Sequence, residues 1–244
     1  MSSQPSGTDA SARTLGRVRS AILTWYAAEH RDFPWRRTRD PWAVLVSEVM
    51  LQQTQASRVV ERFPPFLERF PTAQAMVDAT DAEVLAAWSG LGYNRRALAL
   101  RRAAQAVVAS GWPDDVAGLA SLPGVGAYTA RAVAALAFGL PVGAVDTNVR
   151  RWLVRRFGLP LDAAPSRLQA LADRLASPAA GPAEAAAWMH ASMEFGARIC
   201  SSRKPLCDAC PLARGCPSRM RAVHVPVARQ AAFAGSRRAA RGAV

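Results

Sequence analysis

The spacing of apolar residues constrains this chain more than any other feature of its sequence. In one segment after another, apolar side chains recur three and four positions apart, which is the pattern of helices that bury one face. Alternating patterns of the kind that strands require are nearly absent, and there is no tandem repeat. The helical segments are 13–30, 42–63, 81–92, 95–111, 127–139 and 166–177. The sequence therefore predicts an all-α architecture.

The two ends of the chain depart from this pattern. Residues 1–12 are rich in serine and include glycine, proline and glutamine, a composition that predicts a disordered N-terminus. Residues 217–244 contain arginines, no acidic residue and no sustained periodicity. We therefore expect a flexible basic tail after the last cysteine.

The charge of the chain favours a polyanionic partner. Thirty-one basic residues stand against 18 acidic ones, which gives a formal net charge of +13, and Lys204 is the only lysine. Contacts between cations and phosphates release counterions, so nucleic acid is the partner that such an excess favours. The alternative is that the arginines only solvate an alanine-rich surface, and charge alone does not decide between the two.

Nothing in the sequence indicates a membrane or a secretory route. No apolar run approaches the roughly 18 residues of a membrane-spanning helix. No apolar stretch of the kind found in signal peptides follows the first basic residue. We therefore expect a cytoplasmic, intracellular protein without a membrane partner. In such a reducing setting, thiols are expected to be free or bound to a metal.

Four cysteines fall within one short segment in the order C-x6-C-x2-C-x5-C. They are Cys200, Cys207, Cys210 and Cys216. Four thiolates so close in sequence can surround one zinc ion or one iron–sulfur cluster. Two disulfides are a further possibility, which an intracellular setting disfavours. Zinc ribbons usually pair two C-x2-C knuckles, whereas this segment has one.

A glycine-containing turn, LPGVG at residues 122–126, stands directly before a helical pattern. Glycine permits positive φ and the close approach of a neighbour. The free amides at the start of the following helix bind phosphate well. We therefore expect Gly124, Val125 and Gly126 to contact DNA, although the same letters also suit an ordinary turn between two helices.

Glu48 lies within the apolar run WAVLVSEVMLQQTQ, where helical spacing predicts a stripe shared with Val44, Leu51, Gln52 and Gln55. Burial disfavours the carboxylate anion, so we expect a raised pKa for Glu48. A carboxyl group that holds its proton near neutral pH is what a general acid requires. The alternative is a surface glutamate on a polar stripe.

Three motifs together resemble a known superfamily. The turn LPGVG, Asp146 within GAVDTNVRR and the cysteine segment follow the order found in helix-hairpin-helix DNA glycosylases similar to endonuclease III. The resemblance covers roughly residues 20–216. Within that superfamily, SEVMLQQTQ and GLGYNRRA resemble segments of MutY-type adenine DNA glycosylases. The resemblance implies a base excision repair enzyme that hydrolyses the N-glycosidic bond of adenine mispaired with guanine or 8-oxoguanine.

The resemblance also implies the catalytic residues. Glu48 would protonate adenine at N7, and Asp146 would stabilise the oxocarbenium-like sugar as the bond breaks. Bifunctional members of the superfamily carry a lysine at the position of Tyr128, and tyrosine cannot form their Schiff base. The resemblance therefore implies a monofunctional glycosylase that uses water as the nucleophile, with Tyr128 in the wall of its pocket.

DNA contacts and a cofactor are implied by the same resemblance. Gln52 and Gln55 would contact the base stack or insert into it, and Tyr93 would press beside the opposing base. Such wedges offset part of the cost of rotating a base out of the duplex. The four cysteines would hold one 4Fe–4S cluster, which organises a loop where Arg203 and Lys204 can meet a phosphate.

Two helical subdomains with a DNA-binding cleft between them are also expected. One would run from 36 to 145 and carry the hairpin, while 13–35 would join 146–216 in a second subdomain that carries the cluster. We expect a monomer whose partner is double-stranded DNA containing a mismatch. We expect Trp88 and Trp152 to be buried in the core rather than to stack on DNA bases.

Three departures from the adenine glycosylase pattern keep other substrates open. Asn94 replaces the second tyrosine of the GLGYY segment, and Thr147 replaces the commoner glycine after the aspartate. The segment after the cysteines is too short for the domain that reads 8-oxoguanine in MutY-type enzymes, so we expect that domain to be missing. A thymine or uracil glycosylase for mismatches with guanine is the second hypothesis. A non-catalytic iron–sulfur DNA-binding protein is the third.

Overall fold

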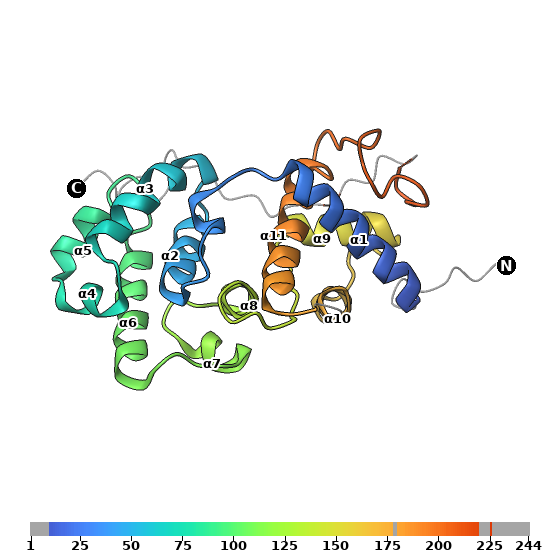
Figure 1. Ribbon diagram of the computed structural model, residues 1–244. Coiled ribbons are helices and arrows are strands. Elements are labelled where there is room, and N and C mark those ends of the chain that lie inside the picture. Colours follow the sequence, from blue (N-terminus) through green and yellow to red (C-terminus); the bar gives the residue numbers. More distant parts are fainter. Residues whose placement is uncertain (1–9, 178–179, 220–224, 226–244) are drawn as a thin grey trace.

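The computed structural model describes residues 10–177, 180–219 and 225, which form helices and turns without any strand (Figure 1). The expected all-α class is confirmed. None of the helices in this part of the chain combines the length and the hydropathy that crossing a bilayer requires. We expected a disordered N-terminus at residues 1–12 and a flexible basic tail at 217–244, and most of these residues lie outside the described ranges.

The helices gather around two hydrophobic cores. The first core is built by η1 (Pro34–Arg36), α2 (Pro41–Leu51), α3 (Ala56–Arg69), α4 (Ala73–Asp78), α5 (Asp81–Ala87), α6 (Arg95–Ser110), α7 (Val116–Ser121) and α8 (Ala127–Leu136). The second is built by α1 (Ala12–Glu29), α9 (Thr147–Phe157), α10 (Pro165–Ala176) and α11 (Pro182–Arg198). Figure 1 shows α2 to α6 at one end of the molecule and α1, α9 and α10 at the other.

Two helices join these cores. α8 packs against α2 on one side and against α11 on the other. α11 contributes Met189 to the first core and Phe195 to the second. The ends of α2, α8, α9 and α11 are therefore held in fixed relation, which is what a site built from several helices needs.

Short polar side chains start many of the helices. The carboxylate of Asp40 accepts from the amide of Ala43 at the start of α2, at 2.9 Å. A reciprocal capping box links Thr80 and Glu83 at the start of α5. Each such cap satisfies amides that have no partner within the helix, typically for about 1 kcal/mol.

The expected helical segment 42–63 forms two helices rather than one. α2 ends at Leu51, and α3 begins at Ala56. The stripe predicted for Glu48 therefore does not include Gln52 and Gln55, and that expectation was wrong. The physical reason is tertiary, because the guanidinium of Arg96 donates to the carbonyls of the last turn of α2, which a continuing helix would need.

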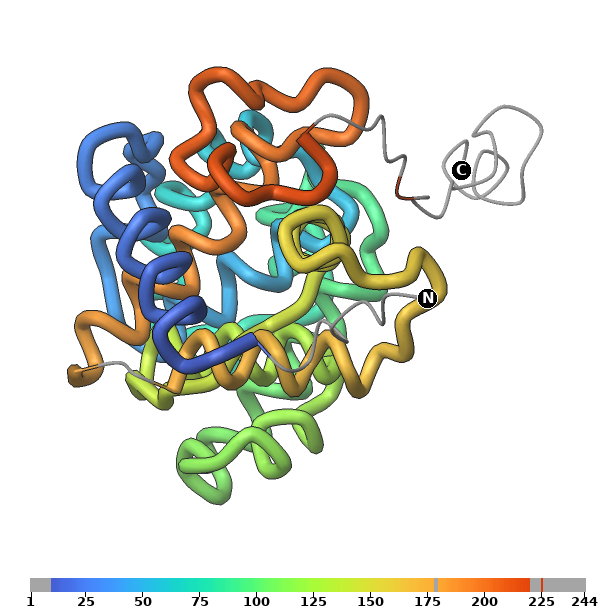
Figure 2. Tube along the Cα trace, turned by 90° about the vertical axis from the view of Figure 1, so that its right-hand side faces the viewer, coloured from blue at the N-terminus to red at the C-terminus, as the bar shows by residue number. Residues whose placement is uncertain are grey.

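Other differences concern helices outside the six expected segments. α4, α7, α9 and α11 belong to none of those segments, and α11 is among the longest helices of the described chain. The expectation for the two tryptophans is confirmed, since Trp88 and Trp152 are fully buried. Figures 1 and 2 both show the loop after α11, which holds the cysteines, folded beside α9.

Candidate active site

A pocket of about 350 Å³ opens where the two cores meet. Its wall draws on the segment between α1 and α2, the end of α2 with the turn into α3, α8, the start of α9 and the second half of α11. Glu48, Tyr128 and Asp146 all line it. Pockets of this size, mostly apolar with a few convergent polar groups, are typical of sites for small ligands or single nucleobases.

Glu48 reaches this pocket from a helix that is otherwise core. Every residue from Trp42 to Met50 is buried, and Glu48 itself is only 4% exposed. Burial first, and the negative charge of Asp146 second, raise the pKa of Glu48 to about 7. No hydrogen bond or ion pair holds its carboxyl group within the described chain. The group is thus free to give a proton to something that enters the pocket.

Asp146 is fixed by the start of α9. Its side chain is the N-cap of that helix and accepts from the amide of Val149 at 2.6 Å, while the Asn148 amide group donates to it at 2.8 Å. The pKa of Asp146 is raised above its ordinary value, because burial outweighs these two hydrogen bonds and the charge of Arg151, which lower it. The pocket thus holds two acids in different environments: Glu48 has no hydrogen-bond partner among the described residues, whereas Asp146 has several. Such a difference allows one acid to donate a proton while the other acts as a carboxylate.

Tyr128 stands in the first turn of α8, beside the two acids. Its hydroxyl donates to the sulfur of Met193 at 2.7 Å. Burial, with the charges of Glu48 and Asp146, raises its pKa well above the ordinary value. Tyr128 is therefore a neutral phenol at neutral pH.

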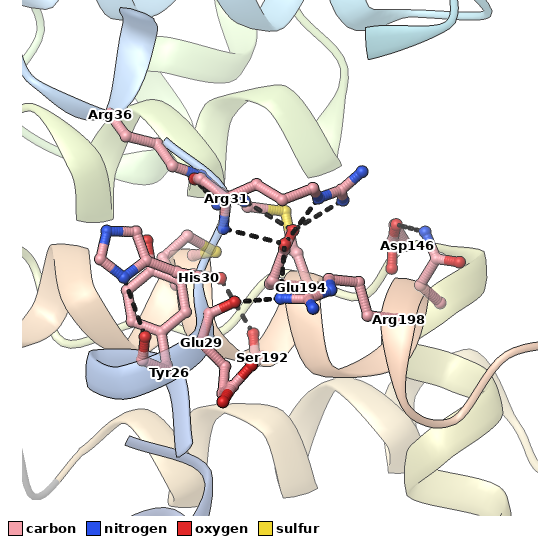
Figure 3. Close-up of polar contacts among 12 residues, drawn as sticks. Tyr26, Glu29, His30, Arg31, Arg36, Asp146, Ser192, Glu194 and Arg198 are labelled. Atoms are coloured by element: carbon pink, nitrogen blue, oxygen red, sulfur yellow. Dashed lines mark hydrogen bonds and ion pairs between the residues drawn. The ribbon is translucent and has the colours of Figure 1, made fainter. Parts of the chain in front are cut away.

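A third carboxylate in the wall was not expected from the sequence. Glu194 on α11 is buried, and it accepts from Arg31 Nε at 2.7 Å and from Arg36 Nη2 at 2.9 Å (Figure 3). Burial would raise its pKa, but the hydrogen bonds from these two arginines outweigh it and lower the pKa to about 2. Figure 3 shows Glu194 with the arginines gathered around it and Asp146 to one side.

His190 lies one turn before Glu194 in the same wall. Burial, and then the charge of Arg36, lower its pKa to about 3, so its imidazole is neutral. The residue pattern around His190 carries no sign of a functional role. A glutamate inside the apolar run ASMEFG is the one signal that could have pointed to Glu194, as a similar signal pointed to Glu48.

The glycine turn lies between α7 and α8. Gly124 has φ +80°, and a Cβ there would meet the Cβ of Ala99 at 2.7 Å, so this position requires glycine. Val125 is buried, whereas Gly126 is exposed at the N-cap of α8 without a side-chain cap. The first amides of α8 thus lack a partner within the helix, as the expected phosphate contact needs.

The residues expected to contact bases differ in their placement. Gln52 lines the pocket and donates to Thr129 Oγ1 at 3.3 Å and to the carbonyl of Gly124 at 3.5 Å. Gln55 is exposed just before α3, outside the pocket wall. Tyr93 is half-buried in the turn before α6, also outside the wall.

The four cysteines are free thiols in the loop after α11. No three His, Cys, Asp or Glu side chains within the described ranges lie close enough together to surround a metal ion. Burial, followed by the charges of the other three thiols, raises the pKa of Cys210 to about 11. Arg203 and Lys204 are exposed in the same loop.

Two arginines of α9 tie this loop to the rest of the protein. Arg155 Nη1 lies 3.6 Å from the sulfur of Cys200, and the thiol of Cys216 lies 3.6 Å from the carbonyl of Arg155. Arg151 donates to the carbonyl of Cys200 at 2.7 Å and to Asn148 Oδ1 at 2.9 Å. The Cys200 thiol beside a buried guanidinium suits an anionic thiolate centre, whose charge the arginine would offset.

Comparison with known proteins gives a family match and curated relatives. The sequence profile of the family described as "HhH-GPD superfamily base excision DNA repair protein" matches residues 46–178. The adenine DNA glycosylase of Mycobacterium tuberculosis (strain CDC 1551 / Oshkosh) is 46% identical over 196 residues, which are 78% of this chain and 64% of the relative. The adenine DNA glycosylase of Mycolicibacterium smegmatis is 44% identical over 230 residues, 91% of this chain and 76% of the relative.

Solved structures agree with the fold. A thermostable thymine-DNA glycosylase superposes with a TM-score of 0.78 at 31% sequence identity, covering 86% of this chain and 99% of that one. The aligned part of the chain corresponds to 64% of the length of the Mycobacterium tuberculosis relative, which is less than two thirds. The similarity to these relatives therefore includes the helices that form the two cores and the pocket.

Proposed function

Since the chain belongs to the HhH-GPD superfamily of base excision DNA repair proteins, we propose that it is a monofunctional DNA glycosylase acting on adenine mispaired with guanine or 8-oxoguanine. One observation carries the proposal. Glu48, an acid without a hydrogen-bond partner among the described residues and with a pKa of about 7, lines the same pocket as Asp146, an acid held by hydrogen bonds.

Proton transfer from Glu48 is the first step of the proposed reaction. The carboxyl group protonates N7 of an adenine rotated into the pocket, which makes the base a better leaving group. The bond between the base and C1′ then breaks, and its electron pair leaves with the base. Because the pKa of Glu48 is about 7, half of the molecules hold this proton near neutral pH.

Asp146 has the complementary role. Loss of the base leaves positive charge on the sugar, and a carboxylate fixed at the start of α9 stabilises that charge without reorganisation. Water then adds its oxygen to C1′, and its proton passes to a carboxylate of the pocket. Both walls thus contribute to one bond cleavage.

A lyase step is not part of the proposal. Tyr128 cannot form a Schiff base, and Lys204 lies exposed in the cysteine loop, away from the pocket wall. Tyr128 instead packs beside both acids and keeps them out of bulk water. The product would be an abasic site with an intact strand.

The proposed cofactor is one 4Fe–4S cluster held by Cys200, Cys207, Cys210 and Cys216. When bound, it would shape the loop so that Arg203 and Lys204 can contact a phosphate. The contacts of Cys200 and Cys216 with Arg155 support this assignment over two disulfides. Purified protein should be brown with about four irons per chain, and a colourless protein with one zinc would contradict it.

The proposed binding mode places mismatched duplex DNA in a cleft between subdomains 36–145 and 13–35 with 146–216, and the protein acts as a monomer. Gly124, Val125 and Gly126 would bind phosphate through the amides at the start of α8. Gln52, Gln55 and Tyr93 would act on the base stack. Binding to DNA would associate the protein with the nucleoid inside the cell.

Excision assays test the substrate. Labelled duplexes carrying A·8-oxoguanine, A·G, T·G, U·G and hypoxanthine are incubated with the protein, and abasic sites are then cleaved with alkali. Release of adenine with the strand intact before alkali is expected. Absence of excision from every duplex would leave a non-catalytic DNA-binding protein.

A thymine or uracil glycosylase is the second candidate. The structural similarity to a thymine-DNA glycosylase at a TM-score of 0.78 favours it, as does the Asn94 that replaces a tyrosine of the adenine glycosylase segment. Release confined to T·G and U·G duplexes would establish it and overturn the proposal for adenine.

A further inference from the structure

Two turns near the pocket are held in a backbone conformation that side chains rarely adopt. Gln53 has φ +58° in the turn between α2 and α3, and Tyr93 has φ +51° in the turn before α6. Among the residues that the structure describes, these are the only non-glycine residues with positive φ. Such a conformation is strained and persists only where surrounding contacts impose it.

A single buried arginine makes contacts to both turns. Arg96, which is 8% exposed, donates to the first turn and to the helix end before it: to the carbonyls of Val49, Met50 and Gln52 and to Thr54 Oγ1. It donates to the second turn through the carbonyls of Leu91 and Gly92, each at 3.1 Å. Its guanidinium also lies 5.4 Å from the centre of the Tyr93 ring.

This contact set suits an arginine and no other side chain. A guanidinium holds five donors in a rigid planar fork, so it can bind several carbonyls in fixed directions, whereas an ammonium is a compact charge with three donors. The carbonyls at the end of α2 also form the negative end of a helix dipole, which favours a cation. Arg96 thus replaces the hydrogen bonds that a continuing α2 would have made.

The two turns carry the side chains that the proposed function directs at the base stack. Gln52 and Gln55 flank Gln53, and Tyr93 is the strained residue of the second turn. If either turn relaxed to negative φ, its side chains would move relative to the pocket. A misplacement of about 1 Å far from the chemistry can cost about 100-fold in rate.

We propose that Arg96 is a positioning residue that locks the Gln52–Gln55 turn and the Leu91–Tyr93 turn into one rigid unit, so that both act on the duplex together when the adenine is rotated out. The inference rests on the proposed function, because it concerns the step before base release. Arg96 touches no reacting atom; it acts through the two turns.

Arg96→Lys tests this, with Arg101→Lys as the matched control. Arg101 lies on the same helix and donates to the carbonyl of Val77 and to Asp81, away from the pocket. The probe is a duplex with 2-aminopurine next to adenine opposite 8-oxoguanine, whose fluorescence rises when the stack opens. We expect Arg96→Lys to slow the rise and single-turnover excision by roughly 10-fold to 100-fold, and Arg101→Lys to change neither.

Two readouts separate positioning from general damage. The midpoint of the pH–rate profile, set by Glu48, should be the same in Arg96→Lys and the unaltered protein. Gln53→Gly should restore part of the lost rate in the Arg96→Lys background, because glycine adopts positive φ without support. Unchanged opening kinetics in Arg96→Lys, or a further loss on adding Gln53→Gly, would overturn the inference.

A milder pair covers the case in which Arg96→Lys fails to fold. Thr54→Val removes one acceptor of Arg96 at nearly constant size, and Thr54→Ser keeps it. Slower opening in the valine variant alone supports the inference, and equal kinetics overturn it. An unaltered protein that opens the duplex but never excises adenine would refute the proposed function while leaving the test of Arg96 valid.

Discussion

Asp146, at the start of α9, adds to the effect of burial in raising the pKa of Glu48 on α2. The two carboxyl groups come from different hydrophobic cores and meet in one pocket. Their coupling has measurable consequences for rate, for pH dependence and for stability.

Removing the proton of Glu48 should stop base release. Glu48→Gln keeps the size of the side chain but cannot donate an acidic proton, so single-turnover excision of adenine should fall by roughly 100-fold to 1000-fold, about 3 to 4 kcal/mol. Duplex affinity should stay near that of the unaltered protein. Glu61→Gln, on the exposed face of α3, is the control, and near-normal excision by Glu48→Gln would reject its role.

Removing the charge of Asp146 should shift the pH dependence as well as the rate. The proposed reaction needs protonated Glu48, so the rate should fall as pH rises past about 7. In Asp146→Asn the pKa of Glu48 is lower, and the residual activity should fall at a lower pH. Asparagine still caps a helix, so the fold should persist. A profile unchanged from that of an exposed control, Asp162→Asn, would contradict the coupling.

The raised pKa of Glu48 should also cost stability at higher pH. Its folded pKa of about 7 exceeds its ordinary value of 4.5, so the folded state binds the proton more tightly and loses stability as pH rises from 4.5 to about 7. The loss is about 3 kcal/mol at most. Thermal unfolding should show Glu48→Gln stabilised relative to the unaltered protein at about pH 8 and little changed at about pH 4.

The hairpin glycines should tolerate substitution unequally. Gly124→Ala introduces a Cβ that meets Ala99 at 2.7 Å and a strained φ of +80°, so it should destabilise the protein by about 1–3 kcal/mol and weaken duplex binding. Gly126→Ala in the same turn meets no protein atom within 4 Å, so it should change the thermal stability little. Equal effects in thermal unfolding would argue against the tight packing of this turn.

Loss of one thiol should remove the proposed cluster. Cys210→Ser should abolish the brown colour and lower the iron content measured after purification, because four thiolates complete such a centre. Duplex affinity should fall with it as the loop carrying Arg203 and Lys204 loses its shape. Asp208→Asn, an exposed neighbour in the same loop, should keep full iron content, and equal iron in both variants would contradict the assignment.

The sequence alone predicted those features that depend on local patterns. Helical spacing gave the all-α class, and an acid inside an apolar run pointed to the burial that raises the pKa of Glu48. It did not predict the end of α2 at Leu51, because QQTQ contains no helix breaker and the cause is Arg96, more than forty positions later. Glu194 was missed for a similar reason, since its partners Arg31 and Arg36 come from the other end of the chain.

The wall of the pocket extends along the sequence from Arg31 to Ala197. No shorter continuous fragment contains a complete site. During translation the chain must emerge as far as α11 before the pocket is complete, and α11 is the last helix of the described chain to arrive. A nascent polypeptide still lacking α11 would therefore carry both Glu48 and Asp146 without a closed chamber around them.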